Sequence, residues 1–360
     1  FALAHNGNLV NIAKLRSDLE EQGAIFQTTN DSEIIAHLMA KERIHTNSTA
    51  EAVLRIMNII SGAYSLIIMT PHRMVVARDP QGFHPLSIGK IKNSWVFASE
   101  TCAFQAVGAT FVRDVEPGEV IVVDREGLHS HREMCGKKHA LCVFEYIYFA
   151  RPDSMIEGQS VHSARINAGR FLAKESPADA DIVIGVPDSG LDAALGYSYE
   201  SGVPYGVGFI KNRYIGRTFI QPTQEAREAA LRIKLNAMRE VVDGKRVVMV
   251  DDSIVRGTTC KRIVNLLREA GAKEVHVRIS SPPFLNPCYF GTDIDNRDKL
   301  IACQMNLEET RALIGADSLA YLSIHAMQNL VPNCKIGRCD ACFTGDYPVY
   351  VPEENEGKEA

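Results

Sequence analysis

The segment from Arg246 to Gly271 constrains the fold most, because an apolar run ends directly on two acidic residues and a helical pattern then follows. The run Val247 to Val250 is typical of a buried strand. Apolar residues recur at helical spacing after the loop, at Ile263, Leu266, Leu267 and Ala270. Strand and helix patterns alternate from residue 180 onward, including a helix expected over residues 224–241. The pattern predicts an α/β fold with a parallel sheet covered by helices and with ligands at the carboxyl ends of its strands.

The loop itself combines two kinds of chemistry. Asp251 and Asp252 are adjacent carboxylates whose repulsion is offset by a divalent cation or by a pair of polyol hydroxyls. The following residues, from Ser253 to Thr259, lead into a helix N-terminus, where free backbone amides favour a phosphate. Arg256 and the hydroxyls of Thr258 and Thr259 are further donors. A sugar phosphate with a diol fits both ends of the loop.

Two other segments of this region carry candidate residues. The PDSG sequence, from Pro187 to Gly190, follows an apolar strand and precedes an Ala-rich helix, so it is either a second anion loop or a plain turn in which Asp188 or Ser189 caps the helix. The KNRYIGRTF segment contains Lys211, Arg213 and Arg217. These charges belong either to a solvated surface loop or to a flap over a ligand.

Residues 1–133 mix strand and helix patterns and differ from the region that follows. The AHNGNL sequence places the amide of Asn6 beside the backbone of Gly7, which suits an oxyanion hole, although an Asn-Gly pair is more often a hairpin turn. Asp31 either caps the next helix or binds a substrate ammonium group.

Nine cysteines are present, and Cys339 and Cys342 form a CxxC that indicates metal or redox chemistry. Cys334 extends it to a CxxxxCxxC spacing, as in ferredoxin-like clusters. For Cys102, Cys260 and Cys303 we expect ordinary buried thiols.

Composition excludes several classes. A chain of 360 residues is long enough for two domains. The net charge of -5 favours no nucleic-acid surface. No apolar run reaches the roughly 18 residues of a membrane span. We therefore expect a cytoplasmic protein with no membrane and no nucleic-acid partner.

The DDSIVRGTT loop resembles the phosphoribosyl pyrophosphate (PRPP) loop of type I phosphoribosyltransferases, and AHNGNL, TTNDSEIIAHL, RDPQGFHPL and FASET resemble the glutaminase domain of N-terminal-nucleophile amidotransferases. Together they resemble the glutamine PRPP amidotransferases of the iron-sulfur type. The resemblance implies an N-terminally incomplete glutaminase domain over residues 1–133, a phosphoribosyltransferase domain over residues 142–330, and a C-terminal tail with cluster ligands over residues 331–360.

The resemblance also implies the roles of individual residues. Asn6 and Gly7 would form the oxyanion hole, and Asp31 would bind the glutamine amino group. The PRPP-binding residues would be Lys211, Arg213, Arg217, Asp251, Asp252, Ser253, Ile254, Val255, Arg256, Gly257, Thr258 and Thr259. Mg²⁺ would be held by Ser189, Asp251 and Asp252. A structural 4Fe-4S cluster would be held by Cys142, Cys288, Cys339 and Cys342, with Cys135 and Cys334 as rival ligands.

The reaction implied is formation of 5-phosphoribosylamine, pyrophosphate and glutamate from PRPP, glutamine and water, the first step of purine synthesis. Purine nucleotides would act as feedback inhibitors of a homotetramer. The family uses an N-terminal Cys as its glutaminase nucleophile, whereas this sequence begins with Phe1, so we expect use of ammonia rather than glutamine. The alternatives are a PRPP-binding regulator without catalysis, a salvage phosphoribosyltransferase and an iron-sulfur oxygen sensor.

Overall fold

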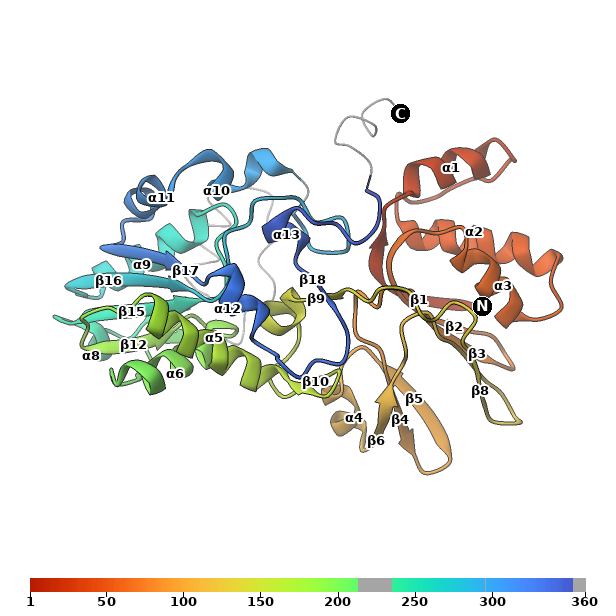
Figure 1. Ribbon diagram of the computed structural model, residues 1–360, viewed down its shortest axis with the longest axis horizontal. Helices are drawn as coiled ribbons and strands as arrows, with labels where there is room; N and C mark the ends of the chain where they lie inside the picture. The colour runs from red at the N-terminus through yellow and green to blue at the C-terminus, as the bar shows by residue number, and fades with distance from the viewer. Residues whose placement is uncertain (213–234, 295, 352–360) are drawn as a thin grey trace.

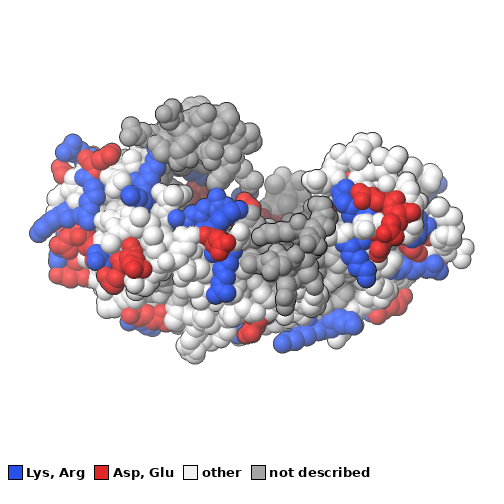
Figure 2. Space-filling view, turned by 90° about the horizontal axis from the view of Figure 1, so that it is seen from above, with Lys and Arg blue, Asp and Glu red and all other residues white. Residues whose placement is uncertain are grey.

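The computed structural model describes residues 1–212, 235–294 and 296–351, which form two lobes joined by a narrow middle (Figure 1). The first lobe runs from β1 to β8 and the second from β9 to α13. On the face in Figure 2, basic and acidic side chains are interspersed over both lobes. Within the described residues, no helix is both long and apolar enough to cross a membrane.

The first lobe has three layers. Its elements are β1 (Ala2–Leu9), α1 (Ile12–Glu20), α2 (Asp31–Ile44), α3 (Thr49–Met57), β2 (Gly62–Met69), β3 (Met74–Arg78), β4 (Ser87–Ile91), β5 (Ser94–Ala98), α4 (Cys102–Val107), β6 (Thr110–Asp114), β7 (Val120–Val123) and β8 (Leu128–His131). An antiparallel sheet of order β1-β2-β3-β7-β8 lies in the middle. Helices α1 to α3 bury one face of it, and the smaller sheet β5-β4-β6 packs on the other.

The second lobe is built around a parallel sheet of order β12-β15-β16-β17, as the alternating pattern predicts. Its elements are β9 (Leu141–Cys142), η1 (Glu145–Phe149), β10 (Met155–Ile156), β11 (Gln159–Ser160), α5 (Val161–Glu175), β12 (Ile182–Gly185), α6 (Gly190–Ser201), β13 (Phe209–Lys211), β14 (Leu235–Ala237), α8 (Arg239–Val242), β15 (Arg246–Asp251), α9 (Thr258–Glu269), β16 (Glu274–Ile279), η3 (Arg297–Lys299), α10 (Ile301–Gln304), α11 (Leu307–Ile314), β17 (Ser318–Tyr321), α12 (Ile324–Gln328), β18 (Arg338–Cys339) and α13 (Ala341–Thr344).

Alternate side chains of the central strands explain the two helical layers. Val248 and Val250 of β15 pack toward α5 and α6, whereas Val247 and Met249 pack toward α9. A strand that is buried on both faces reads as a continuous apolar run, which is the pattern seen in the sequence.

One expectation about this lobe is wrong in part. The helix expected over 224–241 is contradicted at its end, because Leu235–Ala237 is a strand paired with β13 and only Arg239–Val242 is helical; residues 224–234 lie outside the described part. The described part of the C-terminal segment contains regular structure. Its residues 338–344 form β18 and α13, and Tyr347 and Val349 pack against both lobes.

Candidate functional site

Two strand-end loops meet at the acidic pair. Asp251 ends β15 and Asp252 follows it, and each side chain is buried. The Ser189 hydroxyl, from the loop after β12, donates to Asp252 Oδ2 at 2.5 Å. The Ser253 hydroxyl also donates to Asp252, and the Asp252 amide donates to Asp251 Oδ1 at 2.9 Å. The PDSG and DDS segments, which are more than 60 positions apart, therefore form one polar site.

Burial governs the electrostatics of this pair. Burial raises the pKa of Asp251 well above its ordinary value, and the neighbouring charge of Asp252 raises it further. Burial also raises the pKa of Asp252, against the hydrogen bonds from Ser189 and Ser253. Two buried carboxylates and a hydroxyl in contact are hard oxygen donors, so the residues present fit a divalent cation such as Mg²⁺.

Ser189 stands at the N-cap position of α6, but its hydroxyl is directed to Asp252 instead of to the helix amides. Helix α6 can approach β15 because residue 190 is glycine. A Cβ atom on Gly190 would lie 2.6 Å from the Val250 carbonyl oxygen, which is closer than real Cβ contacts. This contact carries Ser189 to the acidic pair, so the plain capping role considered for Ser189 is wrong.

The loop after Asp252 divides into buried and exposed positions. Ile254 packs into the core beneath the sheet, so its side chain faces away from any ligand, and the Val255 carbonyl accepts the Ile301 amide at 2.9 Å. Arg256, Thr258 and Thr259 are exposed at the start of α9.

The N-cap residue of α9 is Gly257, with φ of 77° and no side chain to cap the helix. The first turn contains no acidic residue among these described positions. Exposed hydroxyls and an uncapped, positively polarised helix end together suit a phosphate group.

Lys211 of β13 reaches the other loop, because its ammonium group pairs with the Asp188 carboxylate. The basic KNRYIGRTF segment therefore begins in contact with the PDSG loop. Arg213 and Arg217 lie outside the described residues, so their predicted contacts with PRPP stay predictions.

In the first lobe, Asn6 and Gly7 lie within β1, paired with Ser65 and Tyr64 of β2. The Asn-Gly pair is therefore not a hairpin turn. Gly7 has φ of 144°, and a Cβ atom there would lie 2.0 Å from the Ala63 carbonyl oxygen. Glycine thus lets the strands come together at this point while Asn6 remains exposed.

Asp31 lies in the first turn of α2, and the helix cap is its neighbour Asn30, whose side chain accepts the Ser32 amide. The Asp31 carboxylate accepts the Leu9 amide at 3.1 Å and lies 3.3 Å from His5 Nδ1. Although burial opposes ionisation, these partners hold the pKa of Asp31 below its ordinary value. An ionised Asp31 beside β1 is compatible with binding an ammonium group.

Four cysteines converge on one cavity between the lobes, lined by Cys142, Cys288, Cys339, Cys342, Phe83, Pro287, Phe290, Thr292, Ala341 and Tyr347. Cys142 and Cys339 are direct partners in the parallel pair β9–β18. Burial raises the pKa of the Cys142 and Cys342 thiols well above the ordinary value, and Cys288 and Cys339 add to both shifts. The Phe290 amide also donates to Cys288 Sγ at 3.4 Å. Four sulfur donors in a mostly apolar cavity fit an iron-sulfur cluster.

The rival ligands lie elsewhere. Cys334 contacts the Tyr146 hydroxyl at 3.8 Å, and the thiol of Cys135 has Glu116 and Glu119 as its electrostatic neighbours. Neither residue lines the cavity of the four cysteines. Among the other thiols, Cys102 and Cys260 are buried as expected, but Cys303 is exposed, so that expectation is wrong.

Arg165 of α5 is a buried residue that the sequence did not reveal. Its guanidinium donates to the carbonyls of Tyr146, Tyr148 and Ala150, and Asp252 lies within its electrostatic range. Burial lowers the pKa of Arg165 from its ordinary value. The VHSARINAG pattern predicts a helix there, but it carries no signal that this arginine faces inward.

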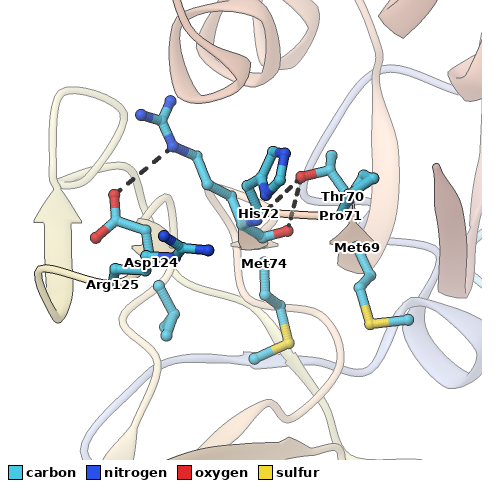
Figure 3. Close-up of a pocket in the computed structure, with 9 residues that line it drawn as sticks. Met69, Thr70, Pro71, His72, Met74, Asp124 and Arg125 are labelled. Carbon is cyan, nitrogen blue, oxygen red and sulfur yellow. Dashed lines mark hydrogen bonds and ion pairs between the residues drawn. The ribbon is translucent and has the colours of Figure 1, made fainter.

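A separate pocket lies on the first lobe, between the turn of residues 69–74 and residues 123–125 (Figure 3). Arg73 and Asp124 pair across it at 3.6 Å. It lies at the end of the sheet where Ala2 pairs with Met69, and none of the sequence-predicted site residues lines it.

Comparison with known proteins assigns both lobes. Residues 1–106 match the family described as "Glutamine amidotransferase domain", and residues 160–280 match "Phosphoribosyl transferase domain". Amidophosphoribosyltransferase of Bacillus subtilis is 52% identical over 98% of this chain and 75% of its own length. That of Archaeoglobus fulgidus is 49% identical over 98% of this chain and 78% of its own length.

A solved structure has the same fold. Glutamine PRPP amidotransferase from B. subtilis, complexed with ADP and GMP, superposes with a TM-score of 0.90 at 52% identity, covering 98% of this chain and 78% of that one. Site geometry, both domain matches and identity over nearly the whole sequence lead to one conclusion: the chain belongs to the amidophosphoribosyltransferase family.

Proposed function

We propose that the second lobe transfers ammonia to C1 of PRPP, forming 5-phosphoribosylamine and pyrophosphate, and that the first lobe belongs to the glutamine-hydrolysing part of the same reaction. This is the opening step of de novo purine synthesis. The observation that carries the proposal is the contact of Ser189 with Asp252, because it joins two strand-end loops on a buried acidic pair.

Each group of residues in the PRPP site has its own proposed role. The amides at the start of α9, with Thr258 and Thr259, hold the 5-phosphate. Asp251 and Asp252 hold the ribose hydroxyls or Mg²⁺, and Ser189 orients Asp252. Bound Mg²⁺ would neutralise the charge of the departing pyrophosphate. Arg213 and Arg217 add positive charge in this proposal.

In the first lobe, we assign the oxyanion hole to Asn6 and Gly7 and the glutamine amino group to Asp31. The Leu9 amide and His5 occupy one carboxylate oxygen each, so the Asp31 carboxylate is held in a fixed orientation. A fixed, ionised acid at the start of α2, beside β1, suits a substrate ammonium next to an amide-hydrolysing centre.

A 4Fe-4S cluster on Cys142, Cys288, Cys339 and Cys342 is part of the proposal. The support is their convergence on one cavity, together with the absence of Cys135 and Cys334 from its lining. Four thiolates bound to one cluster would tie β18 and α13 to β9. This role is structural, and it requires deprotonation of thiols whose pKa is raised by burial, so formation of the cluster would release protons.

Regulation and assembly are proposed from the relatives. Because the B. subtilis structure contains ADP and GMP, we propose purine nucleotides as feedback inhibitors of this chain as well. A homotetramer and a cytoplasmic location are further proposals. The similarity over 98% of the chain, including the amidotransferase match, favours this function over a salvage enzyme or a regulator.

Pyrophosphate release from PRPP and Mg²⁺ tests the proposal, with anaerobically prepared protein and either ammonium or glutamine as the nitrogen source. Asp252→Asn should abolish release with ammonium. The control Asp179→Asn should not, because Asp179 is exposed and lies before β12, at the opposite end of that strand. Pyrophosphate release that requires an added purine or pyrimidine base would indicate a salvage enzyme. PRPP binding without any pyrophosphate release would indicate a regulator.

A further inference from the structure

Two motifs of the first lobe have no role in the reaction described so far, yet both contact the same stretch of the second lobe. This stretch, residues 145–157, is called here the interdomain segment. From RDPQGFHPL, His84 Nδ1 lies 2.7 Å from Glu145 Oε1 and Arg78 Nη1 lies 2.7 Å from Glu157 Oε1, so both ends are held. Figure 1 shows β10, within this segment, beside α4 of the first lobe.

The FASET motif holds the middle of the segment. One carboxylate oxygen of Glu100, Oε2, accepts the Arg151 amide at 2.7 Å and the Ser154 hydroxyl at 2.8 Å. The neighbouring Thr101 Oγ1 accepts the Met155 amide at 2.8 Å. Ser154 is fully buried, so its hydrogen bond to Glu100 is shielded from water. Two adjacent side chains thus fix a single turn of the other lobe.

The second lobe holds the preceding residues through Arg165. Its guanidinium binds the carbonyls of Tyr146 at 2.9 Å and Ala150 at 2.7 Å, and this arginine is 4% exposed. Asp252 and Glu100 both lie within electrostatic range of Arg165. The backbone between Tyr146 and Met155 is therefore hydrogen-bonded to FASET at one end and to Arg165 at the other.

We infer that Glu100 and Thr101 are positioning residues, which fix the interdomain segment and thereby hold the buried Arg165 through the carbonyls that it binds. The kinetic part of this inference rests on the proposed ammonia-dependent reaction, whereas its structural part does not. The alternative is that Glu100 and Thr101 anchor only the turn that they contact. In that case their loss would leave Arg165 and its carbonyl partners unchanged.

Variants of Glu100 distinguish positioning of Arg165 from local anchoring of the turn. Glu100→Ala removes the acceptor of Arg151 and Ser154. Glu100→Gln keeps an amide oxygen that accepts both bonds, so it is the rescuing variant. Glu133→Ala is the control, because its carboxylate is exposed and lies 3.6 Å from His131, outside the interdomain segment.

Hydrogen exchange of the full chain is the first measurement. In Glu100→Ala we expect faster exchange at the Arg151 amide and also at the Ala150 amide, which donates to Glu145 within η1. Glu100→Gln and Glu133→Ala should resemble the parent protein. Faster exchange at Arg151 alone, with Ala150 unchanged, would overturn the inference.

Ammonia-dependent pyrophosphate release is the second measurement. Because small displacements of a catalytic group cost rate more than binding, Glu100→Ala should lower kcat about tenfold while KM for PRPP changes less than about twofold. Unchanged kcat beside altered exchange at Ala150 would refute the link between the interdomain segment and the ammonia-dependent reaction. If the parent protein itself releases no pyrophosphate, the proposed function fails, while hydrogen exchange still decides the structural part.

Discussion

Arg78 offers the sharpest test of how the two lobes hold together. Its side chain has no exposed surface, and it donates from Nη1 to Glu157 at 2.7 Å. Three of its four other N–H groups donate to carbonyls, those of His84, Val115 and Gly82. Glu157 is itself 8% exposed at its side chain, so the pair crosses between the lobes almost without water.

Arg78→Met keeps much of the volume but removes every donor. Breaking a buried ion pair on one side costs about 3–5 kcal/mol, because the remaining charge stays buried without a partner. The double change Arg78→Met with Glu157→Gln removes that charge as well, so it should recover about half of the loss. Each kcal/mol lowers Tm by about 2–4 °C in a domain of this size, which gives a shift of roughly 6–20 °C for the single variant.

Thermal unfolding followed by the fluorescence of Trp95 measures this shift, since Trp95 is the only tryptophan of the chain and lies in β5 of the first lobe. Arg55→Met is the control, because Arg55 pairs with Glu51 on the surface, where such pairs contribute about 0–1 kcal/mol. A shift for Arg78→Met no larger than for Arg55→Met would refute the reasoning. So would a double variant less stable than the single one.

Three further results are expected. Burial and the charge of Asp252 raise the pKa of Asp251 above its unfolded value of 3.8, so the stability of the protein falls as the pH rises past that value. Asp251→Asn should therefore raise the Tm measured without magnesium at pH 7 and leave it unchanged below pH 3.8. A lower Tm of the variant at pH 7 would contradict this. Gly190→Ala should push α6 from β15 and lower kcat for ammonia-dependent pyrophosphate release about 10- to 100-fold with circular dichroism unchanged; full activity would show that the contact is not needed. Cys142→Ser should reduce bound iron to background after anaerobic reconstitution while Cys334→Ser retains it, and equal iron in both would exclude the proposed ligand set.

The parallel sheet could be predicted because its information is local. The apolar run before Asp251 marks a strand buried on both faces, and the loop chemistry marks the end at which ligands bind. By contrast, the strand Leu235–Ala237 depends on pairing with β13, and the sequence gives no sign of that partner. Intrinsic helix preference then predicts the wrong element, because tertiary pairing overrides it.

The sequence predicts which loops form the site, but not how their side chains are oriented and paired. The sequence places Ser189 in a turn, but only packing of Gly190 on β15 directs its hydroxyl to Asp252. Ile254 shows the converse problem: the sequence places it in a ligand-binding loop, but its side chain packs in the hydrophobic core. Arg165 was missed since an arginine in a helical pattern is usually solvated, and its three carbonyl partners come from a separate segment.

The pairing of Cys339 with Cys142 has a consequence for biosynthesis. Roughly 200 residues separate the two, so a ribosome adding about 5–20 residues per second needs some 10–40 seconds to supply the second thiol after the first. During that interval Cys142 has no β18 beside it, and its thiol is open to oxidation or to carriers of iron and sulfide. Oxygen exposure during translation is therefore expected to reduce the yield of correctly joined lobes more than the same exposure of the finished protein, and pulse-labelling under air and under nitrogen measures the difference.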